Sequence, residues 1–409
     1  MLAESRFIIQ KFGGTSVANA NLRQQVAQKV LGAKQEGYNP IVVVSAMGRS
    51  GEPYATDTLV GLTDIGSCSA RELDLLMACG EIISGVVLTN TLNQLGYPAI
   101  FLTGAQAGII TDDSHGNARI LEIRPQEIQR YAQEGYIVVV AGFQGISENG
   151  EITTLGRGGS DTTAAALGVA VTAEFIDIYT DVDGIMTADP QIVEDAKLLE
   201  SVSYNEICQL AHEGAKVIHP RAVEIAMQKN IPLRVRSTFS DSSGTLVTVR
   251  GEAMESIRIG NYGLITGITN IPNITQLKIF TKDYPGIEDI QLKIFRAMAL
   301  AEISVDFINI HPHAVIYTVK DGIADKAMQI LTNMGFKVEA VSGCAKIAAV
   351  GAGMTGIPGV MSSIAEALAK EKIPILQSAD SHTTIWVLVS KQDMERAVRA
   401  IHTQFKLGQ

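Results

Sequence analysis

A lysine and a pair of glycines stand together near the start of the chain, in Lys11-Phe12-Gly13-Gly14-Thr15-Ser16. A short apolar run, Phe7 to Ile9, precedes them and predicts a buried strand, and apolar residues at helical spacing follow from Leu22 to Ala33. Paired glycines let backbone N–H groups approach an anion closely, and the lysine adds a mobile positive charge. The motif therefore predicts a phosphate-binding turn, although it is neither G-x-x-x-x-G-K-[ST] nor G-x-G-x-x-G. A glycine turn required only by packing is the alternative interpretation.

A second glycine-rich turn, Gly156-Arg157-Gly158-Gly159-Ser160-Asp161, precedes an alanine-rich helical stretch. Ser160 or Asp161 is expected to cap that helix. Arg157 can bind a carboxylate through two parallel hydrogen bonds. Asp161 is unusual among anion-binding groups, which indicates that it orients a lysine or a hydrated cation. The alternative is a capped helix beside a solvated arginine.

Six motifs, taken in order, resemble those of the aspartate kinases. They are K-F-G-G-T-S at 11–16, S-A-M-G at 45–48, G-E at 80–81, G-R-G-G-S-D at 156–161, T-D-V-D-G-I-M-T-A-D-P at 180–190 and G-A-K-V-I-H-P at 214–220. The similarity covers essentially the whole chain and points to the bacterial isozymes that serve diaminopimelate and lysine synthesis. Each motif alone is unspecific, whereas the ordered set is highly specific.

The resemblance implies transfer of the γ-phosphoryl group of ATP to the side-chain carboxylate of L-aspartate, the first step toward lysine, threonine and methionine. A carboxylate with an unperturbed pKa of about 4 is already ionised at neutral pH, so this nucleophile needs no general base. Lysines, backbone amides and Mg2+ must instead offset the charge of the phosphates. The family pattern supports Lys11 and Asp161 as catalytic residues, with Mg2+ bound together with ATP and no dedicated metal ligand in the chain.

The same resemblance implies the contacts to aspartate. A zwitterion with an additional carboxylate needs an anion for its amine and a cation for its α-carboxylate, roles that fall to Glu81 and Arg157. Thr56 is assigned through Thr56-Asp57-x-Leu59, where the preceding loop is longer than in many relatives, so Ser45 or Thr58 can take its role. The residues expected to bind aspartate are Ser45, Thr56, Glu81, Arg157 and Ser160.

The contacts to ATP also follow from the resemblance, and one of them departs from the family pattern. The residues expected to bind ATP are Lys11, Phe12, Gly13, Gly14, Thr180, Asp181, Met186, Gln191, Lys216 and Val217. Lys216 is expected to be the second cation, and a surface lysine at a helix end is the alternative. Many relatives read T-x-D-P-R where this chain ends in Gln191. A cation on the phosphates is therefore missing unless Lys197 or another group replaces it, which bears on the affinity for ATP and not on the reaction.

Composition excludes several classes of protein. The 409 residues carry a formal net charge of −10, which argues against non-specific nucleic-acid binding, so a site for anions must rely on a few placed cations. The four cysteines, Cys68, Cys79, Cys208 and Cys344, form no C-x-x-C pair, and disulfides are not expected. The start lacks the apolar core of a signal peptide, and no segment of membrane-spanning length is expected. The prediction is a cytoplasmic protein without membrane or nucleic-acid partners.

Apolar runs and helical patterns alternate up to about Val249, which predicts an α/β domain with a mostly parallel sheet covered by helices on both faces. The expected strands are Ile41–Val44, Ala99–Leu102, Ile137–Val140, Phe175–Tyr179 and Leu233–Ser237; the expected helices are Ala70–Leu95, Arg124–Glu134, Asp161–Ala170, Tyr204–Glu213 and Pro220–Gln228. Ligands of such folds gather at the carboxyl ends of the strands, where Lys11, Ser45, Phe143 and Asp181 are expected. The resemblance implies the three-layer α/β/α amino-acid-kinase fold for residues 1–249, followed by a linker at 250–264.

Beyond the linker the sequence repeats. Pro285-Gly286-Ile287 and Pro358-Gly359-Val360 each open a helix, and their glycines are 73 residues apart (359 − 286). Each copy continues with two strands and a helix, expected at Ile303–Val305, Val315–Val319 and Ile323–Met334, and at Ile373–Ile375, Ile385–Val389 and Gln392–Phe405. Two β-α-β-β-α-β units are predicted. They resemble paired α+β ferredoxin-like ACT modules, at residues 265–341 and 342–409.

The second copy contains a dinucleotide-binding pattern, Gly351-x-Gly353-x-x-Gly356, after an expected strand and before a helix. Only 53 residues follow Gly356 (409 − 356), too few for the rest of a dinucleotide-binding domain. The first copy has the same succession of elements without the glycines. Nicotinamide binding is therefore not predicted.

Paired ACT modules imply that an end-product amino acid binds at the module interface. A helix N-terminus can bind an α-carboxylate and an aspartate can bind an ammonium; plain helix starts and turn residues are the alternative. The residues expected to bind the effector are Asp283, Gly286, Ile287, Asp306, Gly359 and Val360. Lysine, threonine and diaminopimelate are the candidates, with diaminopimelate favoured by overall similarity, and pairing of the modules implies a homodimer or a higher homo-oligomer.

Two other functions remain to be distinguished. A kinase for glutamate or acetylglutamate would share the fold, but such enzymes generally lack paired ACT modules, and an acetylated amine leaves Glu81 without a partner. A non-catalytic amino-acid sensor would not need both Lys11 and Asp161. ATP-dependent formation of an acyl phosphate separates these cases.

Overall fold

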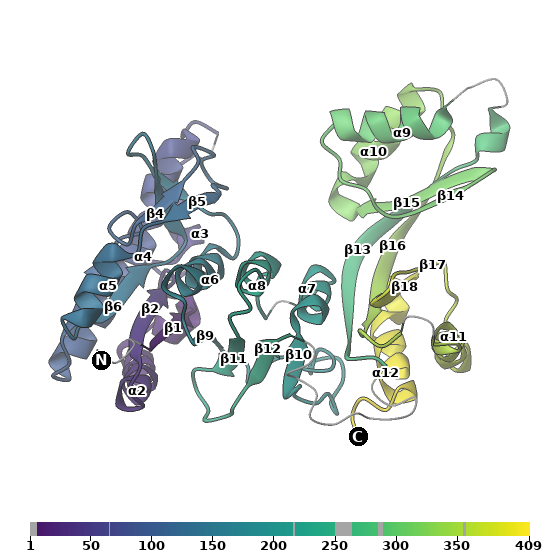
Figure 1. Ribbon diagram of the computed structural model, residues 1–409. Helices are drawn as coiled ribbons and strands as arrows, with labels where there is room; N and C mark the ends of the chain where they lie inside the picture. The colour runs from purple at the N-terminus through teal and green to yellow at the C-terminus, as the bar shows by residue number, and fades with distance from the viewer. Residues whose placement is uncertain (1–5, 65, 216, 250–263, 285–288, 355–356) are drawn as a thin grey trace. The chain divides into compact units, whose positions relative to one another are not determined.

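The computed structural model describes residues 6–64, 66–215, 217–249, 264–284, 289–354 and 357–409. The chain forms two compact units (Figure 1): unit 1 is Met1–Ile185, Leu198–Ala211 and Lys216–Ile257, and unit 2 is Met186–Lys197, His212–Ala215 and Arg258–Gln409. The predicted linker at 250–264 lies almost wholly outside the described residues, as do Lys216, Gly286 and Ile287.

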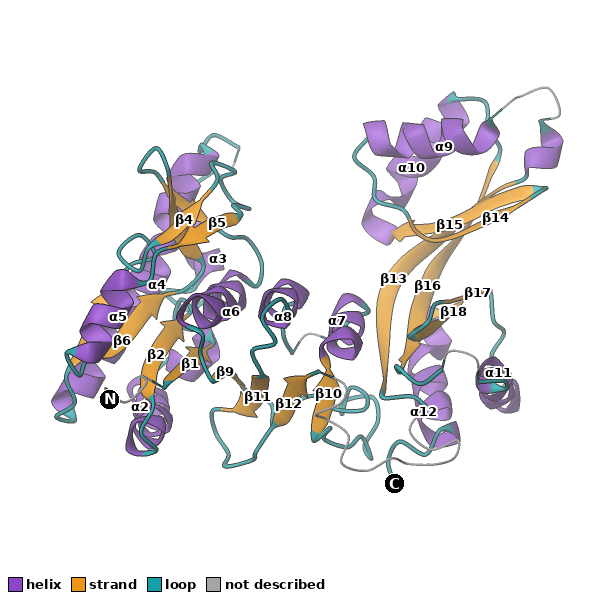
Figure 2. Ribbon diagram, viewed as in Figure 1, coloured by secondary structure: helices purple, strands orange, loops and turns teal. Residues whose placement is uncertain are grey.

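Unit 1 is built on an eight-stranded sheet in the order β10-β12-β11-β9-β1-β2-β6-β3 (Figure 2). The strands are β1 (Phe7–Phe12), β2 (Asn39–Val44), β3 (Ala99–Leu102), β6 (Ile137–Ala141), β9 (Phe175–Thr180), β10 (Ser201–Ser203), β11 (Leu233–Ser237) and β12 (Thr245–Thr248). All neighbours are parallel except β11 and β12. The predicted parallel α/β sheet is therefore confirmed.

Helices cover both faces of this sheet, as a three-layer fold requires. Phe12, Val42 and Val139 pack with side chains of α2 (Ala20–Gln35) and α4 (Ala70–Gln94). On the opposite face, α6 (Gly159–Val171) approaches so closely that a Cβ at Gly168 would lie 2.6 Å from Ile176. The remaining helices of unit 1 are α1 (Gly14–Val17), α3 (Thr56–Val60), α5 (Gln126–Gln133), α7 (Tyr204–His212) and α8 (Pro220–Met227).

Local sequence explains how the main helices begin and end. Asn19 caps α2 by accepting the N–H of Leu22 at 3.0 Å, and Ser69 caps α4 by accepting the N–H of Glu72 at 3.3 Å. Gly37, two residues beyond the end of α2, has a φ of 88°, the left-handed conformation that terminates helices.

A second, four-stranded sheet in the order β5-β4-β7-β8 lies within unit 1 and was not predicted. Its strands are β4 (Ile109–Thr111), β5 (Ile120–Ile123), β7 (Gln144–Ser147) and β8 (Ile152–Thr154). Each has only three or four residues, too few for a period-two pattern to stand out from loop sequence.

Helix α4 corrects one expectation. Its 25 residues are long and apolar enough to cross a membrane by length and composition, whereas no segment of that kind was expected. Half of its apolar stretch is buried in the protein, and Asp74 and Glu81 on it are almost fully buried carboxylates. These features identify α4 as a core helix of the domain.

Unit 2 contains a six-stranded antiparallel sheet in the order β14-β15-β13-β16-β18-β17. The strands are β13 (Gly267–Ile279), β14 (Asp306–His311), β15 (Ala314–Lys320), β16 (Val338–Val350), β17 (Gln377–Asp380) and β18 (Thr384–Ser390). The helices are α9 (Ile290–Leu300), α10 (Asp321–Asn333), α11 (Val360–Lys370) and α12 (Met394–Gln404), with short 3-10 turns at Thr281–Asp283 and Lys391–Asp393.

The two repeats of unit 2 share their central strands. The second half of β13, from Ile274 to Ile279, pairs with β15 and with the first half of β16, whereas its first half pairs only with the end of β16. Strand β16 therefore runs through position 341/342, where the two modules were expected to meet. Separate cores lie under α9 with α10 and under α11 with α12. The residue boundaries of the domains stay a prediction.

Two predicted strand starts were wrong by a few residues. Ile303 and Ile373 precede β14 and β17 and instead terminate helices: their N–H groups donate to Met298 O and Leu368 O, both at 2.9 Å. The preceding residues, Glu302 and Lys372, have positive φ values of 56° and 58°. Both isoleucines are buried, so their apolar character reflects a helix-end contact and not strand pairing.

Candidate functional site

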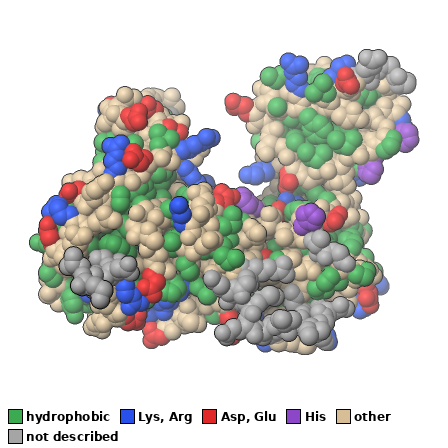
Figure 3. Space-filling model, viewed as in Figure 1, with side chains coloured by type: hydrophobic (Ala, Val, Ile, Leu, Met, Phe, Trp, Pro, Cys, Tyr) green, Lys and Arg blue, Asp and Glu red, His purple; other side chains and the backbone are tan. Residues whose placement is uncertain are grey.

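Four neighbouring parallel strands of unit 1 end at one edge of the sheet. Phe12 of β1 lies opposite Val44 of β2 and Tyr179 of β9, and Val44 lies opposite Ala141 of β6. The turns that follow these strands therefore meet at the same edge, as predicted. On the face shown in Figure 3, acidic and basic side chains are interspersed over the surface.

Lys11 and Asp161 come together although 150 residues separate them in sequence. Lys11 Nζ lies 2.7 Å from Asp161 Oδ1, and the two side chains are 13% and 12% exposed. The N–H of His219 donates to Asp161 Oδ2 at 3.3 Å. Limited exposure to water strengthens such a pair and fixes the direction of the ammonium group.

Helix α6 begins earlier than predicted, which frees Asp161 for this contact. The N-cap is Gly158 at a φ of 69°, the helix starts at Gly159, and the cap involves no side-chain hydrogen bond. The expectation that Ser160 or Asp161 caps the helix was therefore wrong, because a left-handed glycine provides the entry into α6. Ser160 lies against Gly142, where a Cβ would be 2.8 Å from Ser160 Oγ.

The paired glycines of the first turn serve a close backbone approach. Gly48 N–H donates to Gly14 O at 3.0 Å, and a Cβ at Gly14 would lie 2.7 Å from Gly48 O. A Cβ at Gly13 would lie 3.7 Å from Lys11 Nζ. A glycine is therefore required at position 14 by packing, as the alternative interpretation of this turn proposed. The absence of a side chain at Gly13 keeps the space beside Lys11 Nζ available to a ligand.

Glu81 is a buried carboxylate whose pairing is incomplete. Its side chain reaches the loop after β2, where Glu81 Oε1 accepts the N–H of Ala46 at 3.0 Å. Among the residues that the structure describes, Oε2 has no hydrogen-bond partner. Burial raises the pKa of Glu81 to about 8, although the N–H groups of Ala46 and of Glu81 itself act in the opposite direction. A ligand ammonium would supply the missing partner.

The other residues predicted to bind aspartate also belong to unit 1. Ser45 follows β2, and its N–H donates to Phe12 O at 3.1 Å. Arg157 is exposed in the turn before α6, and Thr56 is the first residue of α3. The hydroxyl of Thr58, the alternative to Thr56, accepts the N–H of Gly51 at 3.1 Å.

The residues predicted to bind ATP divide between the two units. Thr180 ends β9, and Asp181 pairs with Arg49 at 2.7 Å. Met186 and Gln191 belong to unit 2, where the exposed Gln191 donates its N–H to Asp189 Oδ1 at 2.9 Å. Lys216 lies outside the described residues, and Val217 is half-buried.

Asp306, one of the predicted effector residues that the structure describes, belongs to an ion-pair cluster of unit 2. Lys346 on β16 lies 2.6 Å from Asp306 and 2.9 Å from Glu213, and its side chain is 5% exposed. Burial alone would lower the pKa of Lys346, but the two carboxylates raise it above its ordinary value. Asp283 is exposed on a 3-10 turn.

The N-terminus of α11 borders a cavity of about 320 Å³. The cap residue Gly359 has a φ of 98°, and Val360 is buried. The lining residues include Leu264, Ser363, Gln404 and Phe405.

The dinucleotide-like pattern has a structural explanation in its first glycine. Gly351 follows β16 and packs on the backbone of Leu264 and Ile265; a Cβ there would lie 2.8 Å from Ile265 Cα. Gly356 lies outside the described residues.

Three polar contacts of the site were missed at the level of sequence. They involve Arg49, paired with Asp181; Thr238, whose hydroxyl lies 2.7 Å from Ser16 Oγ; and the N–H of His219 on Asp161. Arg49 follows S-A-M-G at the end of β2, a position that could have identified it. The other two contacts join residues far apart in sequence, and no local pattern predicts them.

Comparison with known proteins places this geometry in a family. Residues 6–237 match the amino acid kinase family, and residues 339–403 match the ACT domain. The chain thus belongs to the amino acid kinases, and its fold class is as predicted: an α/β/α kinase domain followed by α+β ACT modules.

Within that family the chain belongs to the aspartokinases. It is 53% identical over 408 residues to aspartokinase 1 of Bacillus subtilis (strain 168), covering 98% of this chain and 100% of the relative. The crystal structure of E. coli aspartokinase III in complex with aspartate and ADP (R-state) aligns with a TM-score of 0.77 and 26% identity, covering 98% of this chain and 99% of that one. The T-state of the same enzyme, in complex with lysine and aspartate, aligns with a TM-score of 0.77 and 26% identity, covering 98% and 100%.

Proposed function

We propose that this chain transfers the γ-phosphoryl group of ATP to the side-chain carboxylate of L-aspartate, forming 4-phospho-L-aspartate and ADP. The observation that carries the proposal is the shielded Lys11–Asp161 ion pair beside the Gly13-Gly14 turn, at the edge where four parallel strands end. The relationship to aspartokinases supports aspartate as the substrate.

Catalysis in this site is electrostatic. Lys11 stabilises the negative charge on the transferred group, and the N–H groups of Gly13 and Gly14 donate to phosphate oxygens. Asp161 holds the Lys11 ammonium through the 2.7 Å contact and so keeps it oriented before the reaction starts. The substrate carboxylate attacks in its ionised form, so positioning replaces a general base.

Mg2+ would neutralise part of the phosphate charge when bound with ATP. The site residues fit an ion that is held by the phosphates: Asp161 is committed to Lys11 and to the His219 N–H, and Asp181 is paired with Arg49. The chain's own groups, the Lys11 ammonium and the backbone N–H groups of Gly13 and Gly14, would face the phosphate oxygens. The remaining proposed contacts to the nucleotide are those of Thr180, Asp181, Met186, Gln191, Lys216 and Val217.

Aspartate is bound through its two ends. Glu81 Oε2, which has no partner among the described residues, accepts a hydrogen bond from the substrate ammonium. Arg157 binds the α-carboxylate. Ser160, Thr56 and Ser45 are proposed as further contacts. A substrate without a free amine leaves Glu81 unpaired in a buried position, which disfavours acetylglutamate.

Trapping the acyl phosphate with hydroxylamine tests this function. The full chain is incubated with ATP, Mg2+ and hydroxylamine, and with aspartate, glutamate or acetylglutamate. Hydroxamate formed from aspartate alone supports an aspartate kinase, and formation from glutamate or acetylglutamate would reassign the substrate. Amino-acid binding without hydroxamate from any substrate would support the sensor alternative.

We further propose that an end-product amino acid inhibits the enzyme by binding to unit 2, at Asp283, Asp306, Gly359 and Val360 with the predicted contacts Gly286 and Ile287. Lysine in the T-state structure of the E. coli relative supports an amino-acid effector. Diaminopimelate, lysine and threonine are distinguished by adding each to the hydroxamate assay.

The ACT modules are proposed to pair between chains in a homodimer or a higher homo-oligomer. Strands β14 and β17 are the edges of the unit 2 sheet, and Ile308 and Ile310 on β14 are 45% and 55% exposed. Unpaired strand edges favour association of this kind. Light scattering at several protein concentrations measures the assembly, and a monomer at all of them would contradict it. A cytoplasmic location is proposed with these assignments.

A further inference from the structure

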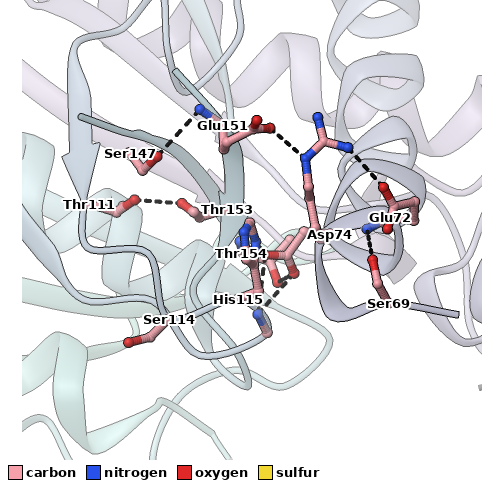
Figure 4. A network of polar contacts seen from close by, with 12 residues as sticks. Ser69, Glu72, Asp74, Thr111, Ser114, His115, Ser147, Glu151, Thr153 and Thr154 are labelled. Atoms are coloured by element: carbon pink, nitrogen blue, oxygen red, sulfur yellow. Dashed lines mark hydrogen bonds and ion pairs between the residues drawn. The ribbon is translucent and has the colours of Figure 1, made fainter. Parts of the chain in front are cut away.

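A buried carboxylate that is not among the predicted substrate contacts holds three segments of unit 1 together (Figure 4). Asp74 lies on α4 and has no exposed surface. Its oxygens lie 2.8 Å from His115 Nδ1 and accept the N–H of Gly116 at 3.0 Å, the N–H of Thr154 at 3.1 Å and the hydroxyl of Thr154 at 2.5 Å. A buried carboxylate with this many donors fixes the segments that supply them.

The held segments lead directly to Arg157. Thr154 is the last residue of β8, three positions before the arginine, and Thr154 O accepts the N–H of Ala118 at 2.8 Å. Gly156 has a φ of 74° and lies against the loop between β4 and β5: a Cβ there would be 2.9 Å from Asn117 Oδ1 and 3.2 Å from Gly116 O. The backbone before Arg157 is therefore held in two ways: Thr154 is bonded to Asp74, and Gly156 packs against the loop that contains Gly116, which is also bonded to Asp74.

The same helix carries Glu81. Asp74 and Glu81 are seven residues apart, about two turns of α4, so they share one face of the helix about 10 Å apart along its axis. Both carboxylates are buried, at 0% and 2% exposure. A single rigid element thus carries the proposed partner of the substrate ammonium and also anchors the loop of the residue proposed for the α-carboxylate.

We propose that Asp74 is a positioning residue for the amino-acid substrate, which sets Arg157 at a fixed separation from Glu81 by holding Gly116 and Thr154. This inference rests on the proposed assignment of Arg157 and Glu81 to aspartate. The bonds of Asp74 go to the β4–β5 loop and to β8, whereas Lys11 lies on β1 and the paired glycines follow that strand. Loss of the anchor is therefore expected to weaken aspartate binding and to leave ATP binding nearly unchanged.

The test is Asp74→Asn in the full chain, because the amide nitrogen cannot accept the N–H groups that face it. Steady-state kinetics are expected to show a KM for aspartate about 10- to 100-fold higher, as misplacement of a binding group predicts, with a KM for ATP within about twofold of the wild type. A merely structural role would lower the amount of active enzyme and move neither KM. An unchanged KM for aspartate, or an equal rise in both KM values, would overturn the proposal.

Glu151→Gln is the matched control. Glu151 lies just before β8 and pairs with Arg71 of α4 at 2.8 Å, so it joins the same helix to the same hairpin without contacting Asp74. Its side chain is 37% exposed, and removal of this pair is expected to leave both KM values at the wild-type level. A rise in the KM for aspartate equal to that of Asp74→Asn would mean that any loosening of the hairpin has this effect, which would overturn the role of Asp74.

Thr154→Val keeps the test decisive if Asp74→Asn does not fold. It removes only the hydroxyl donor, and the KM for aspartate is expected to rise several-fold, with recovery in Thr154→Ser. A KM for aspartate that stays at the wild-type value in Thr154→Val would overturn the proposal. Wild-type enzyme inactive toward aspartate would instead refute the proposed function, so the two failures are distinguishable.

Discussion

Single titratable side chains, shielded from water to different degrees, define the chemistry of this protein. Lys11 and Asp161 keep slight exposure and form an ion pair, so each side chain orients the other. Glu81 is more deeply buried and has a proton acceptor without a partner among the described residues, so its ordinary state without ligand is shifted toward the neutral acid. The oriented Lys11 ammonium is suited to bind a phosphate, and the Glu81 carboxylate is suited to bind a cation.

Lys11→Met is expected to lower kcat by about 10²- to 10³-fold, because a preorganised positive charge on the transferred group is lost. Single-turnover kinetics with ATP and aspartate measure the effect. Lys29→Met is the control: Lys29 also forms an ion pair, at 2.8 Å with Asp241, whose side chain is fully exposed. Similar losses in both variants would contradict a specific role for Lys11.

Glu81 is expected to impose a pH dependence on aspartate capture. Below its pKa of about 8 the free enzyme holds a proton that must leave before an ammonium can bind, so kcat/KM for aspartate should rise with pH and level off above that value. Glu81→Gln should abolish the rise and increase the KM for aspartate. The pH profiles of the two enzymes provide the measurement, and profiles of the same shape would contradict the assignment.

The same group should also affect stability. The pKa of Glu81 in the folded protein lies above the ordinary glutamate value of 4.5, so its contribution to stability is fully present below pH 4.5 and declines as pH rises toward about 8. Glu81→Gln cannot titrate and is expected to be more stable than the wild type near the upper end of that interval. Thermal denaturation at several pH values checks the sign; a variant that loses stability relative to the wild type as pH rises would contradict it.

Among the elements, α4 does most to organise the amino-acid side of the site. It presents Asp74 and Glu81 on one face, and glycines allow it to approach its neighbours. A Cβ at Gly80 would lie 2.7 Å from the Ala46 Cβ, beside the N–H that Glu81 accepts. Close packing of this kind ties the position of the carboxylate to the loop after β2.

Gly80→Ala should therefore shift the helix, lower the free energy of unfolding and raise the KM for aspartate, although alanine is intrinsically the better helix former. Gly32→Ala on α2 is the matched control, since a Cβ there meets nothing within 4 Å. That variant is expected to gain about 0.4–1 kcal/mol of stability without a change in kinetics. Denaturant titration and steady-state assays measure both, and a stabilised Gly80→Ala would contradict the close approach.

Across the whole molecule, the main architectural feature is that the two ACT modules share β13 and β16 in one sheet. Each module therefore depends on strands that continue into the other, and a buried charge in the shared region affects both. Lys346 lies in that region, bonded to Glu213 and Asp306.

Lys346→Met should destabilise unit 2 by about 3–5 kcal/mol, because it leaves the Glu213 carboxylate buried without its partner. The side chains of Lys346 and Glu213 are 5% and 10% exposed. The double variant with Glu213→Gln should recover part of the loss. Lys370→Met removes an exposed helical pair and is expected to leave the free energy of unfolding nearly unchanged. Calorimetry of the full chain compares them, and equal losses in the two single variants would contradict the buried pair.

The sequence by itself determined what depends on local pattern. Apolar periodicity predicted the strands and helices of the kinase sheet, and parallel alternation implied that the turns after β1, β2, β6 and β9 share one edge. The six motifs, taken in order, predicted the family and, through it, the reaction. The parallel α/β sheet and the tandem repeat could be predicted because each rests on neighbouring residues or on direct repetition, whereas the three-layer arrangement was implied by the family resemblance.

Only the tertiary structure decided which distant groups meet. The sequence indicated that Asp161 orients a lysine or a hydrated cation; the structure identifies Lys11 as its partner and removes the expected capping role. The raised pKa of Glu81 follows from burial. No local pattern distinguishes Asp74 from other helix carboxylates; its role follows from the bonds that Gly116 and Thr154 donate to it in the folded protein. These features depend on contacts between segments tens to hundreds of residues apart, which leave no periodic trace in the chain, because hydrogen bonding and desolvation act through space.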